Sequence, residues 1–108
     1  MQGACSVDAL RSYRYNRYTM NKTIELTVLT SFGCSSCKLF LAFWDTVKGD
    51  WPNVQFEEID MLTEYGQALL IKHHAFASPA IIINDALFSA GGFQEEKFLT
   101  TLAELSLP

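Results

Sequence analysis

The chain has 108 residues, which suits one domain with one hydrophobic core. Hydrophobic residues make up 49% of it, enough to fill that core, and this excludes a wholly disordered chain. The formal net charge of −4 disfavours nucleic acid as a partner. No apolar run approaches the roughly 20 residues that a membrane-spanning helix needs. We therefore expect neither nucleic acid nor a membrane among the partners.

Residues 1–21 differ from the rest of the chain. They hold all three arginines and show no sustained apolar period. We expect a poorly ordered N-terminal tail here and one folded domain over residues 22–108. The tail lacks the apolar segment of a secretory signal, and three cysteines are an odd number for a disulfide-stapled secreted domain. The expected location is therefore the reducing cytoplasm, where a close cysteine pair is more often catalytic or metal-binding than structural.

The folded part opens with a strand–helix–strand pattern. Residues 23–30 (TIELTVLT) alternate in polarity and are β-branched, which predicts a strand. A helix is predicted over 34–48 and ends at Gly49. Its inner face should contain Leu39, Phe40, Phe43, Trp44 and Val47. A second strand over 54–61 should lie parallel to the first.

A second helix and a third strand follow. Thr63 can cap a helix over 64–73, and Ser78-Pro79 then indicates a loop between this helix and the next strand. The apolar residues 80–83 predict a short buried strand.

The chain ends with a hairpin and a helix. Asn84-Asp85 suits a two-residue turn, because both residues tolerate positive φ, and 86–90 returns as a fourth strand. Gly91-Gly92 forms a turn before a helix that starts near Phe93. Its inner face should contain Phe98, Leu99, Leu102 and Leu105. This βαβ, α, ββ, α order predicts an α/β fold, a four-stranded mixed sheet with helices on both faces.

Two cysteines lie at the junction of the first strand and helix, in Cys34-Ser35-Ser36-Cys37. The first turn of a helix has unpaired N–H groups and a partial positive charge, which stabilise a thiolate. Cys34, at the helix start, should be the exposed cysteine, and Cys37, one turn later, should be shielded. This asymmetry suits a two-step exchange in which Cys34 attacks a disulfide and Cys37 resolves the mixed disulfide.

Other interpretations of the pair remain open. The cysteines could be buried free thiols, or they could bind a metal or an iron–sulfur cluster. Zinc takes four ligands, and the other soft candidates, Cys5, His73 and His74, lack paired spacing. A cluster needs four thiolates, so it would require a second subunit or an added thiol. We predict no metal site in the chain, and a metal- or cluster-binding protein is the alternative to a redox enzyme.

Two further groups of polar residues have competing interpretations. Glu57, Glu58 and Asp60 could include a proton acceptor for Cys37, or they could mark a strand edge that faces water. His73 and His74 end the second helix, where they could act as a switch or as ligands. We expect instead solvated side chains that favour the helix dipole.

Three segments together resemble the thioredoxin-like superfamily: the Cys34–Cys37 motif, Ser78-Pro79-Ala80-Ile81-Ile82-Ile83-Asn84 and Gly91-Gly92. The resemblance covers nearly all of residues 23–106. It is closest to small glutaredoxin-like, redox-active disulfide proteins, which share a Gly-Cys-x-x-Cys start and a Thr/Ser-Pro-Ala-aliphatic-Asn strand. In the superfamily, the proline that matches Pro79 is cis and lies against the cysteine pair.

The resemblance implies a thiol–disulfide oxidoreductase that takes part in electron transport. Cys34 would be the nucleophile and Cys37 the resolving cysteine. The matching residues that would contact substrate are Ser78, Pro79, Gly91 and Gly92. Phe32, which lies beside the cysteine pair in the sequence, could also shape a substrate groove, or it could plug the end of the sheet. No cofactor is required, although glutathione can act as the reductant. The implied partners are a protein disulfide or glutathione, and a reductase that donates electrons.

The chain also departs from better-known members of the superfamily. Val28 stands where thioredoxins carry a buried acid six residues before the first cysteine. Glutaredoxins bind glutathione with Thr-Val-Pro and Gly-Gly-x-Asp-Asp segments. The corresponding segments here are 77–79 (ASP) and 91–95 (GGFQE), in which the glycines match and the aspartates do not.

Overall fold

The computed structural model describes residues 22–107, which form four strands and three helices. The elements are β1 (Ile24–Thr30), α2 (Ser35–Val47), the 3₁₀ turn η1 (Lys48–Asp50), β2 (Val54–Asp60), α3 (Glu64–His73), β3 (Ala80–Ile83), β4 (Ala86–Ala90) and α4 (Glu95–Leu105). Each predicted strand and helix is present, with bounds close to those expected. The predicted tail, residues 1–21, lies outside the described residues, so its order and the domain boundary stay predictions.

The four strands form one mixed sheet in the order β2-β1-β3-β4. β1 and β2 are parallel, as predicted, whereas β3 is antiparallel to both β1 and β4. The turn between β3 and β4 is the predicted one, because Asn84 and Asp85 have φ angles of 51° and 63°. Asn84 also ties this turn to β1. Its N–H donates to the Glu25 carbonyl at 2.8 Å, and its side-chain oxygen accepts from the Glu25 N–H at 2.9 Å.

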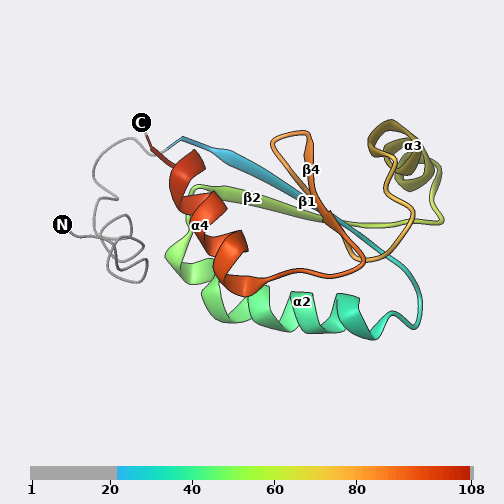
Figure 1. Cartoon of the computed structure of the whole chain (residues 1–108), viewed down its shortest axis with the longest axis horizontal. Helices are drawn as coiled ribbons and strands as arrows, with labels where there is room; N and C mark the ends of the chain where they lie inside the picture. Colours follow the sequence, from blue (N-terminus) through green and yellow to red (C-terminus); the bar gives the residue numbers. More distant parts are fainter. Residues whose placement is uncertain (1–21, 108) are drawn as a thin grey trace.

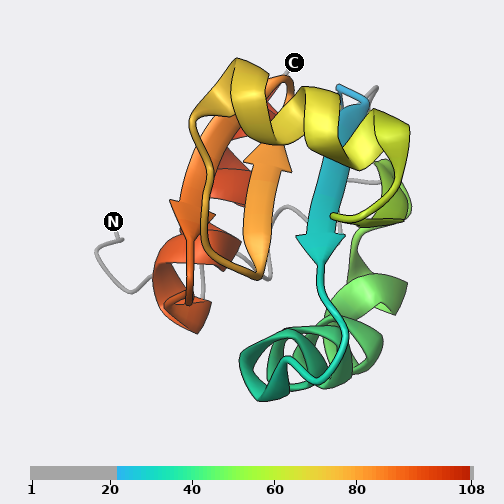
Figure 2. The same cartoon turned by 90° about the vertical axis from the view of Figure 1, so that its right-hand side faces the viewer.

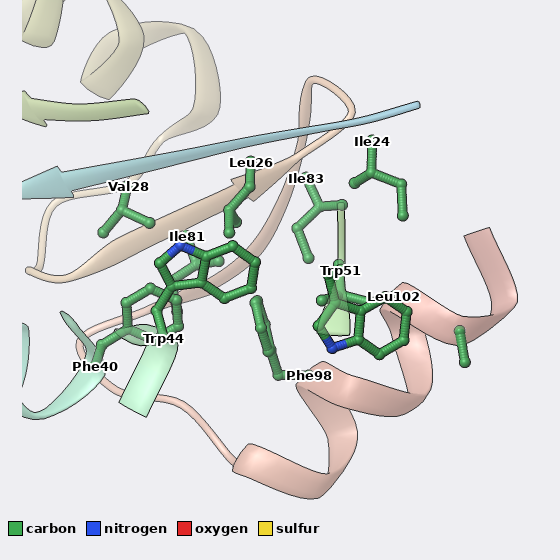
Figure 3. Close-up of a cluster of buried hydrophobic side chains, with 11 residues drawn as sticks. Ile24, Leu26, Val28, Phe40, Trp44, Trp51, Ile81, Ile83, Phe98 and Leu102 are labelled. Carbon is green, nitrogen blue, oxygen red and sulfur yellow. The ribbon is translucent and has the colours of Figure 1, made fainter. Parts of the chain in front are cut away.

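Helices cover both faces of this sheet, as predicted (Figures 1 and 2). α2 and α4 pack on one face, over the larger of two apolar clusters (Figure 3). That cluster contains Ile24, Leu26, Val28, Phe40, Trp44, Trp51, Ile81, Ile83, Phe98, Leu102 and Ala103. α3 packs on the other face, where Leu69 and Leu70 contact a smaller cluster around Leu29 and Ile82. Within residues 22–107, no helix is long and apolar enough to cross a membrane.

Most of the predicted inner face of α2 is buried. Phe40 and Trp44 belong to the larger cluster, and Phe43 and Val47 pack against it. Leu39, however, is 67% exposed, so the prediction for this residue is wrong. Leu39 lies about a quarter turn of the helix away from the centre of the stripe that the other four residues form.

Trp51 is a core residue that the helical periodicity did not predict. α2 ends at Val47, and the chain continues through η1, where the Trp51 N–H donates to the Lys48 carbonyl at 3.0 Å. This turn directs the Trp51 indole into the larger cluster together with Leu102 (Figure 3). The side chain is 5% exposed.

The end of α3 lies against the β3–β4 hairpin. Lys72 Nζ donates to both carboxylate oxygens of Asp85 at 3.0 Å. The His73 side chain is only 7% exposed, and its Nε2 lies 3.3 Å from Asp85 Oδ1. The expectation of a solvated side chain is therefore wrong for His73, because the hairpin covers it. It is right for His74, which is exposed and ends the helix with a left-handed backbone (φ 53°).

Replacing Phe98 by alanine should lower the free energy of unfolding by about 3–5 kcal/mol, because it leaves a cavity in the core. The Phe98 ring is fully buried, and it lies 5.3 to 6.1 Å from the rings of Phe40, Phe43, Trp44 and Phe88. Urea denaturation measures the change. The matched control is Phe32→Ala, which removes a ring that is 98% exposed. It should change the unfolding free energy by less than about 0.5 kcal/mol, and equal losses in the two variants would contradict this core.

Replacing Lys72 by methionine should raise the pKa of Asp85. The Lys72 hydrogen bond is the main cause that holds this pKa below its ordinary value of 3.8. The pair therefore stabilises the fold above pH 3.8, and this contribution is lost as the pH falls through the lower folded-state pKa. An NMR titration of the carboxyl carbons measures the shift. Lys48→Met is the control, because Lys48 pairs with Asp45 instead, at 2.8 Å. A pKa of Asp85 that is the same with and without Lys72 would refute the assigned pair.

Candidate active site

Cys34 and Cys37 form a disulfide where β1 leads into α2, with their Cα atoms 5.2 Å apart. Cys34 occupies the N-cap of α2, with an extended backbone (φ −84°, ψ 107°). Its sulfur accepts a hydrogen bond from the Cys37 N–H at 3.1 Å. The sulfur thus takes the place of the Ser, Thr, Asp or Asn oxygen that usually caps a helix. It lies at the unpaired N–H groups of the first turn, where partial positive charge stabilises a thiolate.

The two cysteines differ in accessibility in the predicted order. Cys34 is half-buried, whereas Cys37 is 3% exposed. A tight turn presents Cys34, because its N–H donates to the Ser31 carbonyl at 3.3 Å and Gly33 has a φ of +75°. Of the two cysteines, Cys34 is therefore the one that a partner sulfur can reach directly.

The Ser78-Pro79 segment lies against the cysteine pair. The Ser78–Pro79 peptide bond is cis, and Pro79 is fully buried. The Ser78 hydroxyl donates to Cys34 Sγ at 3.2 Å. Two segments that are 44 residues apart in the chain thus meet at the same sulfur atom.

Gly91 connects the end of β4 to this proline loop. Its N–H donates to the Pro79 carbonyl at 3.0 Å, and its φ is +93°. A Cβ at this position would lie 3.2 Å from the Ala77 Cβ, so the close approach also favours glycine. Gly92 follows, and both glycines line a surface pocket of about 510 Å³ together with Phe88, Ser89, Ala90, Phe93, Gln94 and Lys97. The two glycines therefore sit beside the loop that contacts Cys34.

Sequence reasoning missed Ser31. Its hydroxyl lies 2.7 Å from the Ser78 hydroxyl, so a third side chain joins the contact with Cys34. The signal is in the strand register. β1 pairs with β3 so that Leu29 lies opposite Ala80, and extending this pairing by two residues along each chain places Ser31 opposite Ser78.

Aromatic side chains are exposed on both segments that meet at Cys34. Phe32, one of the predicted substrate residues, is 98% exposed. It therefore does not plug the end of the sheet and is free to contact a partner. Phe76, two residues before Ser78, is 74% exposed and was not predicted.

The acidic residues of β2 face water at an edge of the sheet. β2 is an edge strand, and Glu57, Glu58 and Asp60 are all exposed. The Glu58 side chain contacts the end of β1, where it accepts a hydrogen bond from Thr30 Oγ1 at 3.0 Å. The role of proton acceptor for Cys37 stays a hypothesis.

Of the cysteine and histidine residues that could be soft metal ligands, Cys34 and Cys37 form a disulfide. His73 and His74 lie at the end of α3. Within residues 22–107, no three His, Cys, Asp or Glu side chains come together as a metal site. Cys5 lies outside the described residues.

No protein-family model matches the chain, and no curated protein matches it in sequence. Solved structures do match. A structure described as that of a malarial protein is 16% identical, with a TM-score of 0.60 over 81% of this chain and 100% of that one. Thioredoxin O2 from Arabidopsis thaliana in its oxidized state is 14% identical, with a TM-score of 0.64 over 94% of this chain and 86% of that one. At these identities the similarity establishes the fold alone, and that fold is thioredoxin-like, as the sequence predicted.

Proposed function

We propose that the protein is a thiol–disulfide oxidoreductase that exchanges disulfides with a protein or glutathione partner through Cys34 and Cys37. The thioredoxin-like fold and the Cys34–Cys37 disulfide support a redox function in general. One observation carries the finer proposal. Cys34 Sγ is accessible and accepts two hydrogen bonds at a helix N-terminus, while Cys37 is buried one turn behind it.

In the reductive direction, the Cys34 thiolate attacks one sulfur of a partner disulfide. A bond forms between that sulfur and Cys34 Sγ, and the partner's other sulfur leaves as a thiolate with the electron pair of the broken bond. Cys37 then loses its proton to water, and its thiolate attacks Cys34 Sγ, which releases the partner's second thiolate. The partner gains two electrons, and the protein loses two as the Cys34–Cys37 disulfide forms. A dithiol donor or two glutathione molecules return these electrons.

The surroundings of Cys34 suggest how a partner binds. We assign substrate contacts to Phe32, Ser78, Pro79, Gly91 and Gly92, of which Ser78 touches Cys34 and Gly91 bonds to Pro79. The exchange requires no bound cofactor, since the two thiols carry the electrons. We place this activity in the cytoplasm, with a reductase as the electron donor, because cellular thiols there keep such pairs reduced.

A redox titration tests the proposal. The full chain, with Cys5→Ser and without metal, is equilibrated in graded thiol/disulfide buffers, alkylated and weighed as the intact protein. We expect a reversible two-thiol transition between about −150 and −280 mV, the range of catalytic dithiols. If no reversible transition is found, or if anaerobically purified protein shows iron–sulfur absorbance that disappears together with the metal, the cysteines are ligands and the proposal is wrong.

Single substitutions should separate the roles of the two cysteines. Cys34→Ser should abolish disulfide exchange, because it removes the attacking sulfur. Cys37→Ser should trap a mixed disulfide between Cys34 and its partner, detectable as a mass adduct that a reductant removes. Cys5→Ser is the matched control and should exchange at the full rate. Normal turnover by Cys37→Ser with a dithiol-dependent substrate would instead indicate a one-cysteine route that uses glutathione.

A further inference from the structure

We infer that Ser31 is a positioning residue for Cys34: it donates a hydrogen bond to Ser78, and Ser78 in turn donates to the Cys34 sulfur. This relay of two hydroxyls would stabilise the Cys34 thiolate once the disulfide is reduced. The inference rests on the proposed function, in which that thiolate is the nucleophile.

The direction of the relay follows from counting protons. A serine hydroxyl carries one hydrogen, which it can donate, and two lone pairs, which can accept. The Ser78 hydroxyl donates its hydrogen to Cys34 Sγ at 3.2 Å. It therefore has none left for the 2.7 Å contact with Ser31, so the Ser31 hydroxyl must be the donor there. A hydroxyl that accepts one hydrogen bond donates a stronger one, because each bond polarises the next.

The fold holds the two serines together. Ser31 directly follows β1, and Ser78 lies two residues before β3. Both are at the end where the pairing of these strands finishes with Leu29 opposite Ala80. Both serines are half-buried. Because partial burial limits the access of water, a water molecule does not readily replace the Ser31 hydroxyl as the donor to Ser78 when that hydroxyl is removed.

The hydrogen bonds distinguish the two cysteines. In the described part of the chain, cysteine sulfur accepts hydrogen bonds from the Cys37 N–H and the Ser78 hydroxyl, and both bonds end on Cys34. Hydrogen bonds to the charged form of a group favour that form, so both donors would favour the Cys34 thiolate over the thiol once the disulfide is reduced. The side chains of Ser35 and Ser36, the residues between the cysteines, make no hydrogen bond to either sulfur. The stabilising hydroxyls come from the strand ends instead.

A thiol titration in a double-mutant cycle tests the relay. The full chain with Cys5→Ser and Cys37→Ser has Cys34 as its single thiol, which avoids coupled titration. Absorbance of the thiolate at 240 nm against pH then gives its pKa without any partner. Ser78→Ala should raise this pKa by about one unit, because a bond to a charged group is lost. Ser31→Ala should raise it by about 0.3 units, because it weakens that bond without removing it.

The cycle separates a relay from two independent effects. If Ser31 acts through Ser78, the variant with both serines replaced should have the same pKa as Ser78→Ala alone. Ser31→Thr, which keeps the hydroxyl, should restore the original value. The relay is wrong if Ser31→Ala leaves the pKa unchanged, if its shift persists in full after Ser78→Ala, or if Ser78→Ala has no effect.

Controls distinguish this chemistry from damage to the fold and from failure of the proposed function. Ser106→Ala removes a buried serine hydroxyl near Lys22 and Asn53, at the other end of β1, and should leave the Cys34 pKa unchanged. With the cysteine pair intact, loss of the relay should also shift the reduction potential to more negative values, because the reduced form is less stabilised. If the thiol titration gives the expected pKa shifts but the protein exchanges no disulfides, the proposed function is wrong and the relay is still supported.

Discussion

The site depends on the antiparallel pairing of β1 with β3. This pairing brings Leu29 opposite Ala80. The two segments next to the paired residues form the site: the segment after β1 contains Ser31 and Cys34, and the segment before β3 contains Ser78. A slip of one residue in this register would move every side chain of β3 to the opposite face of the sheet. The same slip would separate the Ser78 hydroxyl from the Cys34 sulfur. The strand register that buries the apolar side chains of β1 and β3 therefore also sets the contact between Ser78 and Cys34.

The aromatic core also fixes the position of the start of α2, where the two cysteines lie. Phe40 and Trp44 hold this helix against the sheet, and the Phe98 ring lies 5.3 Å from Phe40 and 6.1 Å from Trp44. Cys37 lies one turn before Phe40, on the same buried side of the helix, which explains why it is shielded. Cys34 lies before the first turn and is therefore only half-buried. The difference between the two cysteines therefore follows from where the buried stripe of α2 begins.

Features encoded by a few neighbouring residues were predictable, and features that depend on distant contacts were not. The Asn84-Asp85 turn and the Thr63 cap, whose oxygen accepts from the Gly66 N–H at 3.0 Å, each follow from local backbone chemistry. The element order and the position of the cysteine pair followed from periodicity. The burial of Trp51 depends on a 3₁₀ turn, and that of His73 on a hairpin that lies beyond α3 in the chain. Ser31 was missed for the same reason, because its partner Ser78 is 47 residues away.

The absence of an acid at Val28 changes how the site can stabilise charge. Val28 is fully buried in the larger cluster, so this position contributes packing and no proton acceptor. A carboxylate buried there would need compensation for lost hydration, whereas hydroxyls that are already paired cost much less to bury. Serine hydroxyls also do not titrate near neutral pH. The relay from Ser31 through Ser78 would therefore stabilise the Cys34 thiolate equally across that range and would add no pH dependence of its own to the exchange.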